Sequence, residues 1–273
     1  MLKKILVTLI SLTTLAGCAN KPDNQLDPYE GYNRAMFKFN HDIDYITLRP
    51  VASVYDAIVP NPVKEGVTNF FDNLDMIPTV ANDILQTKFQ YAIADTCRFL
   101  VNSTIGLFGL FDMAKHINLP PHHETLGLTF AHWGAKNSPY FVIPLLGPST
   151  IRDTVAYPIN YRFLTVYPRI HSQTLAYGLL ATRYVDLRAQ LLPADKLVDE
   201  AFDPYIFVRD AYLQRQQKLI KQSDKEEALD TYVEELIEHD KADNKAETKA
   251  EDKNIDKHAK HSTVRAGNTT EHR

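Results

Sequence analysis

Hydrophobic residues divide the chain into a short apolar start, a long aromatic-rich middle and a polar end. Lys3 and Lys4 precede an apolar stretch that runs from residue 5 to residue 15. Of the 28 aromatic residues (14 Tyr, 13 Phe and 1 Trp), all except Tyr232 lie within residues 29–212. The pattern therefore predicts one folded domain, which we place at 27–221, between two segments of different character.

Within 27–221 the hydrophobic positions follow the three- and four-residue spacing of helices. One such stripe includes Ala176, Leu180, Tyr184, Leu187 and Leu191. Strand-like alternation is scarce, since only residues 140–146 look extended and Pro144 interrupts them. The pattern predicts an all-α domain built of short helices.

Prolines and capping residues predict where these helices begin. A polar residue before a proline is a typical helix start, because the side chain caps the free amides and proline suits the first turn. The candidate caps are Asp27, Asn61, Ser149, Ser172 and Asp203. The longest proline-free intervals, 79–119 and 169–192, are expected to hold the longest helices.

The first 17 residues are typical of a lipoprotein signal peptide. The apolar stretch is shorter than the roughly 20 residues that span a bilayer, and it ends in small residues directly before Cys18. We expect cleavage before Cys18 and acyl chains on that cysteine as a membrane anchor. Ala19, where aspartate would favour inner-membrane retention, favours the outer membrane. An ordinary secretory signal with a chance cysteine is the alternative.

The ends of the mature chain are expected to lie outside the domain. Residues 18–26 form a linker after the lipidated cysteine. Residues 222–273 form a charged tail with one possible helix at 224–238, where Leu229 and Val233 recur at helical spacing. Residues 240–273 have almost no apolar side chains, so we expect them to be disordered.

Charge and cysteine content exclude several classes of protein. The chain has a formal charge of −4, and without Lys3 and Lys4 it is −6, which is not the charge of a nucleic-acid binder. With Cys18 acylated, Cys97 is the only thiol left, and its spacing from Ile93 and Leu100 favours a buried structural cysteine.

No enzyme motif is complete. His123-Glu124 begins like a zinc-protease helix, but Gly127 stands where the second histidine is needed. Ser149 lacks the second glycine of a nucleophile elbow, and we find no phosphate-binding glycine loop. We therefore expect neither catalysis nor a cofactor, with a metal site at His122, His123 and His132 as a remote alternative.

Two further features stand out, and by composition alone the second favours a plain globular core. Residues 127–153 combine turn-forming and apolar residues, which predicts a hairpin-like excursion. Aromatic clusters at 36–40, 69–71 and 105–111 suit helices that lie in a membrane surface, although a plain globular core is the alternative.

Several motifs together resemble the VacJ/MlaA family of outer-membrane phospholipid-binding lipoproteins. They run in order from residue 26 to residue 221 and cover nearly the whole predicted domain. The signature positions are Asn33, Phe39, Asn40, Arg49, Asn69, Arg98, Asn102, Arg152, Asp153 and Arg209.

The resemblance implies a ring of short interfacial helices around an amphipathic channel, with the segment near 127–153 as a channel-lining hairpin. The hairpin positions are Gly127, His132, Trp133, Gly134, Lys136, Pro139, Tyr140, Pro144, Gly147 and Pro148. Residues 135–138 depart from the glycine-rich family pattern and place Lys136 near the implied path of the lipid phosphate.

The resemblance also implies the function and the partners. The protein would extract mislocalised phospholipids from the outer leaflet of the outer membrane and pass them to a soluble periplasmic lipid-binding carrier of an ABC-transporter system. It would associate with a trimeric outer-membrane porin and sit, lipid-anchored, in the periplasmic leaflet. A lipid-anchored porin scaffold and a phospholipase are the rival hypotheses.

Overall fold

The computed structural model describes residues 26–226, 228–229, 231–233 and 235. The chain divides into two compact units, residues 1–224 and 225–273. The expected signal peptide, Cys18 and nearly all of the expected tail lie outside the described residues.

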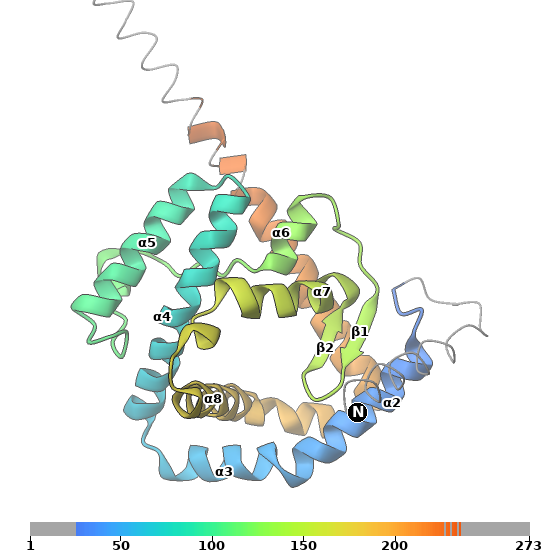
Figure 1. The fold of residues 1–273 in the computed structure, drawn as a ribbon. Helices are drawn as coiled ribbons and strands as arrows, with labels where there is room; N and C mark the ends of the chain where they lie inside the picture. Colours follow the sequence, from blue (N-terminus) through green and yellow to red (C-terminus); the bar gives the residue numbers. More distant parts are fainter. Residues whose placement is uncertain (1–25, 227, 230, 234, 236–273) are drawn as a thin grey trace, which may run out of the picture. The chain divides into compact units, whose positions relative to one another are not determined.

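The described part of the first unit is mostly helical, with one small two-stranded sheet (Figure 1). The all-α expectation therefore holds except at this sheet. The helices are α2 (Glu30–Ile46), α3 (Leu48–Ile58), α4 (Asn61–Leu85), α5 (Phe89–Thr104), α6 (Leu126–His132), α7 (Ile151–Ile159), α8 (Gln173–Asp199) and a last helix that is continuous over 204–226. The strands are β1 (Tyr140–Ile143) and β2 (Gly147–Thr150), and short helical turns are η1 (Ala114–Ile117), η2 (Asn160–Leu164) and η3 (Tyr167–Arg169).

The expected caps are right at two of the helix starts. The Ser172 hydroxyl accepts a hydrogen bond from the Leu175 amide at the start of α8, and Asp203 caps the last helix. Ser149 does not cap α7, because the neighbouring Thr150 takes that role. Asp27 does not cap α2 either, since its carboxylate is buried in the tertiary contacts described below.

Proline is a poorer helix terminator here than expected. The expected interval 169–192 does hold most of α8, but α8 continues through Pro193, and α4 continues through the buried Pro78. A proline inside a helix loses one backbone hydrogen bond, and packing outweighs that loss where α4 lies along α5 and α8 along α3.

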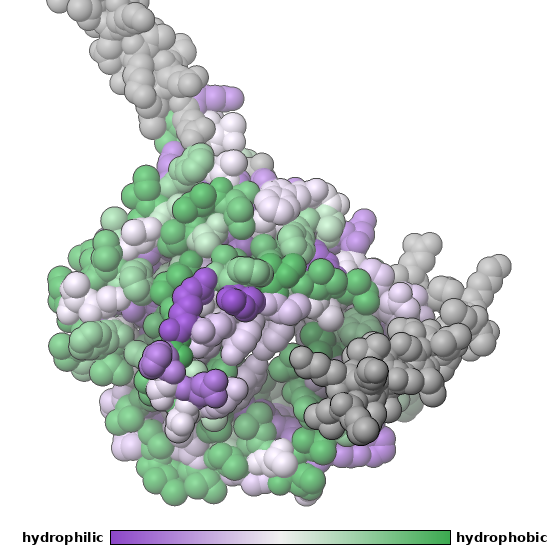
Figure 2. Space-filling model, in the orientation of Figure 1, coloured by the Kyte–Doolittle hydropathy of each residue, from purple (hydrophilic) through white to green (hydrophobic). Residues whose placement is uncertain are grey.

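The elements pack mainly as pairs: α4 on α5, α3 on α8, α6 on α7, and α2 on β1. The apolar core is small and centres on Tyr140, Val142 and Tyr205. Among the described residues, more polar and charged side chains than hydrophobic ones are buried. Figure 2 shows the counterpart on the surface, where hydrophobic residues (green) cover much of the face in view.

No helix within the described ranges is both long enough and apolar enough to cross a membrane.

Candidate functional site

The expected hairpin exists, but it is narrower than residues 127–153. Strands β1 and β2 pair antiparallel, with Tyr140 opposite Thr150 and Ile143 opposite Gly147. Leu145 and Gly147 adopt positive φ angles (66° and 92°) and turn the chain. Residues 126–132, which include Gly127 and His132, instead form helix α6.

Side chains alternate across the hairpin. Tyr140 and Val142 point into the core, and the ring of Phe141 stacks on Tyr32 with 5.1 Å between centroids. Pro144 and Pro148 are exposed. The hairpin therefore has one face on the core and its turn at the surface.

Two asparagines of α2 hold the hairpin backbone. The Asn33 side chain donates to the Tyr140 carbonyl (3.1 Å) and accepts from the Val142 amide (2.9 Å). Asn40 repeats this contact two helical turns later, because it donates to the Ile143 carbonyl (2.9 Å) and accepts from the Leu145 amide (2.7 Å). An amide side chain can satisfy a donor and an acceptor at once, so these two signature positions fix β1 and the turn on α2.

A buried carboxylate links α2 and the hairpin to the last helix. Asp27 is 2% exposed and accepts hydrogen bonds from Asn33 (2.8 Å), from the Tyr205 hydroxyl and from Arg209 (3.2 Å). Burial and the negative charge of Asp27 raise the pKa of the Tyr205 hydroxyl far above its ordinary value. Arg209, another signature position, thus supplies the positive charge that a buried carboxylate needs.

A second junction joins α6 to α7 and explains Gly127. A Cβ atom at Gly127 would lie 2.0 Å from Oδ1 of Asp153, so only glycine fits there. Asp153 also accepts from Arg152 (3.0 Å) and from the Tyr212 hydroxyl (3.0 Å). Gly127 therefore belongs to a close helix contact rather than to a hairpin turn.

The loop before the hairpin carries the other expected positions. Gly134 has a φ of 111°, and Trp133 is 57% exposed. Lys136 is exposed and forms an ion pair with Asp224 (2.8 Å). Its charge is therefore compensated, which weakens its expected role near a phosphate. The Pro139 carbonyl accepts from the Ile151 amide and ties the loop to the start of α7.

Three further signature residues hold the segment 105–119 against α4 and α5. Arg98 donates to Asp112 (2.7 Å) and to the Leu119 carbonyl, while Asn102 accepts from the Ala114 amide (2.9 Å). Asn69 of α4 donates to the carbonyl of Leu110 (3.3 Å). The signature residues so far are clamps between elements.

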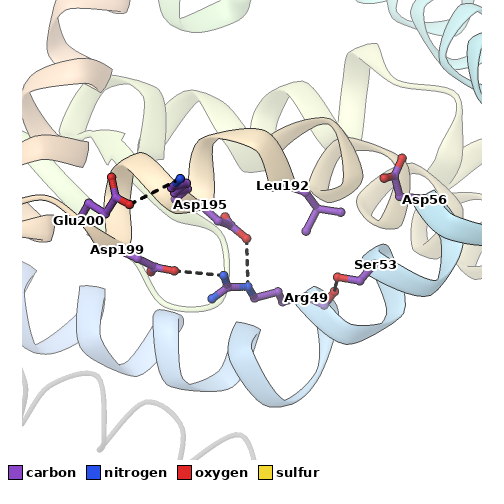
Figure 3. A pocket seen from close by; sticks show the side chains of 8 residues that line it. Arg49, Ser53, Asp56, Leu192, Asp195, Asp199 and Glu200 are labelled. Carbon is purple, nitrogen blue, oxygen red and sulfur yellow. Dashed lines mark hydrogen bonds and ion pairs between the residues drawn. The ribbon is translucent and has the colours of Figure 1, made fainter.

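Of the two remaining signature residues, Arg49 also joins two elements, whereas Phe39 does not. Arg49 of α3 pairs with Asp195 (3.0 Å) and Asp199 (3.1 Å) of α8. Figure 3 shows these pairs in a groove of about 510 Å³ between the two helices. Phe39 is exposed on α2, so the structure does not bring it to the hairpin core.

One buried polar network is not predicted by any pattern in the sequence. Lys88, which is 1% exposed, donates to Glu124 (2.9 Å) and to Ser223 (2.6 Å). Gln86 donates to the other oxygen of Glu124 (2.9 Å). The network joins the α4–α5 turn to the start of α6 and to the last helix. Its hydrogen-bonded partners lie 36 to 137 positions apart, so no local spacing marks it.

The histidines do not gather. His122 lies 3.1 Å from Asp95, whereas His123 is exposed and His132 lies at the end of α6. Within the described ranges, no group of three or more His, Cys, Asp or Glu side chains is placed to hold a metal ion.

Helix α5 shows an inverted polarity, by which we mean that its polar side chains are buried and its apolar side chains are exposed. Asp95, Arg98 and Asn102 are buried, while Phe89, Ile93 and Leu100 are 51–65% exposed. Cys97 lies on the exposed side, so the expectation of a buried thiol is wrong. A water-soluble helix usually buries its apolar stripe, whereas α5 exposes it.

The same polarity recurs in the segment that follows α5. Leu107, Phe108 and Gly109 all have positive φ angles (51°, 60° and 91°), and Phe108 is 79% exposed. Positive φ is uncommon for bulky residues. The clamps of Arg98 and Asn102 hold this turn with its phenylalanine outward.

These features agree with the comparison with known proteins. The sequence model of the MlaA lipoprotein family matches residues 25–219. The chain belongs to the MlaA lipoprotein family. That match covers α2 to α8, the hairpin and every signature position above.

Two relatives and one solved structure show how similar this chain is to other proteins. A protein of Rickettsia felis is 37% identical over 68% of this chain and 74% of its own length. The intermembrane phospholipid transport system lipoprotein MlaA of Escherichia coli K12 is 34% identical over 76% of this chain and 84% of its own length. A solved structure from work on the maintenance of bacterial outer-membrane lipid asymmetry superposes with a TM-score of 0.62 at 32% identity, and covers 71% of this chain and 98% of that one.

Proposed function

We propose that this MlaA lipoprotein extracts mislocalised phospholipids from the outer leaflet of the outer membrane and passes them to a periplasmic carrier. The Escherichia coli K12 relative is named as a lipoprotein of an intermembrane phospholipid transport system, and the similar structure concerns outer-membrane lipid asymmetry. Retrograde transport of phospholipid maintains that asymmetry.

The observation that carries this proposal is the inverted polarity of the domain. Polar and charged residues dominate its buried set, and large apolar side chains are exposed on several helices. On α3, for example, Val51, Val54 and Ile58 are 53–74% exposed and lie on one face. A domain of this kind gains free energy by placing its outside in hydrocarbon and can offer polar groups to a lipid head group inside.

The contacts between elements support a ring. They form a closed series in which α2 packs on α3, α3 on α8, α8 on α4, α4 on α6, α6 on α7, α7 on β1, and β1 again on α2. The elements can be followed in that order in Figure 1. A closed series of helices is what a central lipid channel requires, and the asparagine-clamped hairpin is our candidate for its lining.

Lipidation at Cys18 would place the domain in the periplasmic leaflet of the outer membrane. Ala19 is consistent with that destination. The proposed partners are a trimeric porin, next to which the ring would sit, and the soluble lipid-binding carrier of an ABC-transporter system.

The test is a deletion strain complemented with single-cysteine variants. Deleting the gene is expected to raise the phospholipid content of the outer leaflet, measured by labelling of surface-accessible lipid. Wild type should restore the low level, whereas Cys18→Ala should not, because the unlipidated chain is not delivered.

Cys97→Ala is the matched control, since Cys97 is exposed and forms no disulfide. It should complement fully. Unchanged outer-leaflet phospholipid in the deletion strain would contradict the transport function and favour a scaffold. Full complementation by Cys18→Ala would contradict the proposed anchor.

A further inference from the structure

Asp186 of α8 is a buried carboxylate without a basic partner. It is 2% exposed and accepts hydrogen bonds from Thr68 (3.1 Å), Gln190 (2.9 Å) and the Tyr55 hydroxyl (3.3 Å), all of which are neutral. In the part of the chain that the structure describes, no lysine, arginine or histidine forms an ion pair with it. Buried carboxylates are normally paired with a cation, because neutral donors alone do not offset the loss of water.

Two other buried carboxylates show the usual arrangement. Asp27 has Arg209 at 3.2 Å, and Glu124 has Lys88 at 2.9 Å. Both clamp elements together through a complete ion pair. Asp186 differs from them because it has no such ion pair. It also lines a cavity.

The cavity lies between α3, the start of α4 and α8, and its volume is about 380 Å³. Volumes of roughly 300–1,000 Å³ are typical of small-molecule sites. Tyr55, Ala189 and Pro193 give it apolar walls, and Asp186 with its hydrogen-bond partners forms a polar part. We call it the Asp186 cavity.

The charges around the Asp186 cavity favour a cation. Lys64 is the one basic residue among those lining it, and this lysine already pairs with Asp56 at 2.6 Å. Glu65 and Asp186 therefore remain uncompensated in the lining. In the neighbouring groove of Figure 3, Asp195, Asp199 and Glu200 all have basic partners.

We propose that the Asp186 cavity binds the primary ammonium of an aminophospholipid head group, with Asp186 as its counter-charge. The proposal rests on the proposed lipid transport and adds a head-group preference to it. A primary ammonium donates three hydrogen bonds, and charge-assisted bonds to a carboxylate are the strong ones. Choline cannot donate such bonds, and phosphatidylglycerol would bring a negative charge to a negative cavity.

The experiment is a lipid competition on the full lipidated protein. The protein is extracted in mild detergent and incubated with mixed micelles of equal phosphatidylethanolamine, phosphatidylcholine and phosphatidylglycerol, and native mass spectrometry counts the bound lipids. A charge-assisted hydrogen bond predicts that bound phosphatidylethanolamine exceeds phosphatidylglycerol about tenfold. Phosphatidylcholine should fall below phosphatidylethanolamine.

Two Asp→Asn substitutions test whether Asp186 causes this head-group preference. Asp186→Asn keeps the side-chain shape and removes the charge, so the ratio should fall to about one. Asp42→Asn removes an exposed carboxylate on α2 that pairs with Lys38, and should leave the ratio unchanged. An unchanged ratio in a folded Asp186→Asn would overturn the role of Asp186.

If Asp186→Asn does not fold, the lipid competition on the wild-type protein still tests the proposal. Equal binding of the three lipids would contradict the head-group preference and leave lipid transport intact, whereas binding of no lipid would contradict the proposed function itself. The primary ammonium could belong to a lipid head group or to a soluble amine. Free ethanolamine, added without lipid, distinguishes these two sources. We expect no adduct, and an adduct would point to a soluble amine instead.

Discussion

Asp83 and Asp95 form a buried carboxyl pair between α4 and α5. Both are fully buried, and within the described residues no basic, amide or hydroxyl group donates to either carboxylate oxygen of Asp83. Loss of water, and then the charges of Asp95 and Glu124, raise the pKa of Asp83 to about 8. Lys88, which acts in the opposite direction, is already paired with Glu124, and His122 faces Asp95. The raised pKa favours the protonated form of Asp83 in the folded protein at neutral pH.

This pair makes the folded state less stable as the pH rises. The pKa of Asp83 is higher in the folded than in the unfolded chain, so the folded state holds the extra proton between about pH 4 and about pH 8. We expect the thermal unfolding midpoint to fall across that window. Asp83→Asn mimics the protonated acid, so its midpoint should be higher than that of wild type at pH 8 and close to it at pH 4. Parallel pH profiles for the two proteins would contradict this reading.

At the same scale, the sequence identified residues better than it identified their partners. Asn33 and Asn40 stand in recognisable motifs, but they bind backbone groups that lie 103 to 109 positions away. Such a contact depends on the tertiary fold and leaves no local pattern. Gly127 shows the same limit, because its small size serves the approach of Asp153 and not a turn.

At the scale of elements, helical spacing correctly predicts which residues of α5 share a face. It wrongly predicts that this face is buried. Cys97 shares a face with Ile93 and Leu100, as expected, but this face points outward. Periodicity shows that two faces differ and does not show which one packs against the neighbouring helix. In α5 it is the polar face that is buried, because Arg98 and Asn102 bind the segment that follows the helix.

The two asparagine clamps on the hairpin should differ in strength. Asn33 is fully buried, and Asn33→Ala would leave two hairpin backbone groups and Asp27 short of a partner, which is expected to cost about 3 kcal/mol of unfolding free energy. Asn40 is partly exposed, so water can replace it and Asn40→Ala should cost about 1 kcal/mol. Denaturant unfolding gives both values, and hydrogen exchange at the Val142 and Leu145 amides shows which end of the hairpin is released.

Asn137→Ala is the matched control for these clamps. Asn137 is exposed in the loop before the hairpin, so the change should stay within about 0.5 kcal/mol. If Asn33→Ala and Asn40→Ala were equally mild, the hairpin would be held by its apolar face on Tyr205 and not by the asparagines.

On the scale of the whole molecule, composition gave no hint of the inverted polarity. The mean composition matches that of a water-soluble protein, with 44% hydrophobic and 23% charged residues. What differs is where these residues lie, and this becomes visible only when α3, α5 and the segment 105–111 are seen to expose their apolar side chains together. The aromatic clusters of the sequence suit a membrane surface, but composition alone favours a globular core, and only the family resemblance reverses that preference.

The inverted polarity predicts that the domain binds membranes without its lipid anchor. Ile93→Asp places a charge on the exposed face of α5, where the side chain is 65% exposed and supports no core packing. Folding in detergent should therefore be unaffected, while the partition of the Cys18→Ala chain into phospholipid vesicles should fall at least about tenfold, since an aspartate in hydrocarbon costs about 2.5–3.5 kcal/mol. Vesicle flotation measures this partition. Gln217→Asp adds the same charge at an exposed polar position of the last helix and should float like the parent. Equal flotation of both variants would mean that the exposed face of α5 does not enter the bilayer, and would contradict its role in membrane binding.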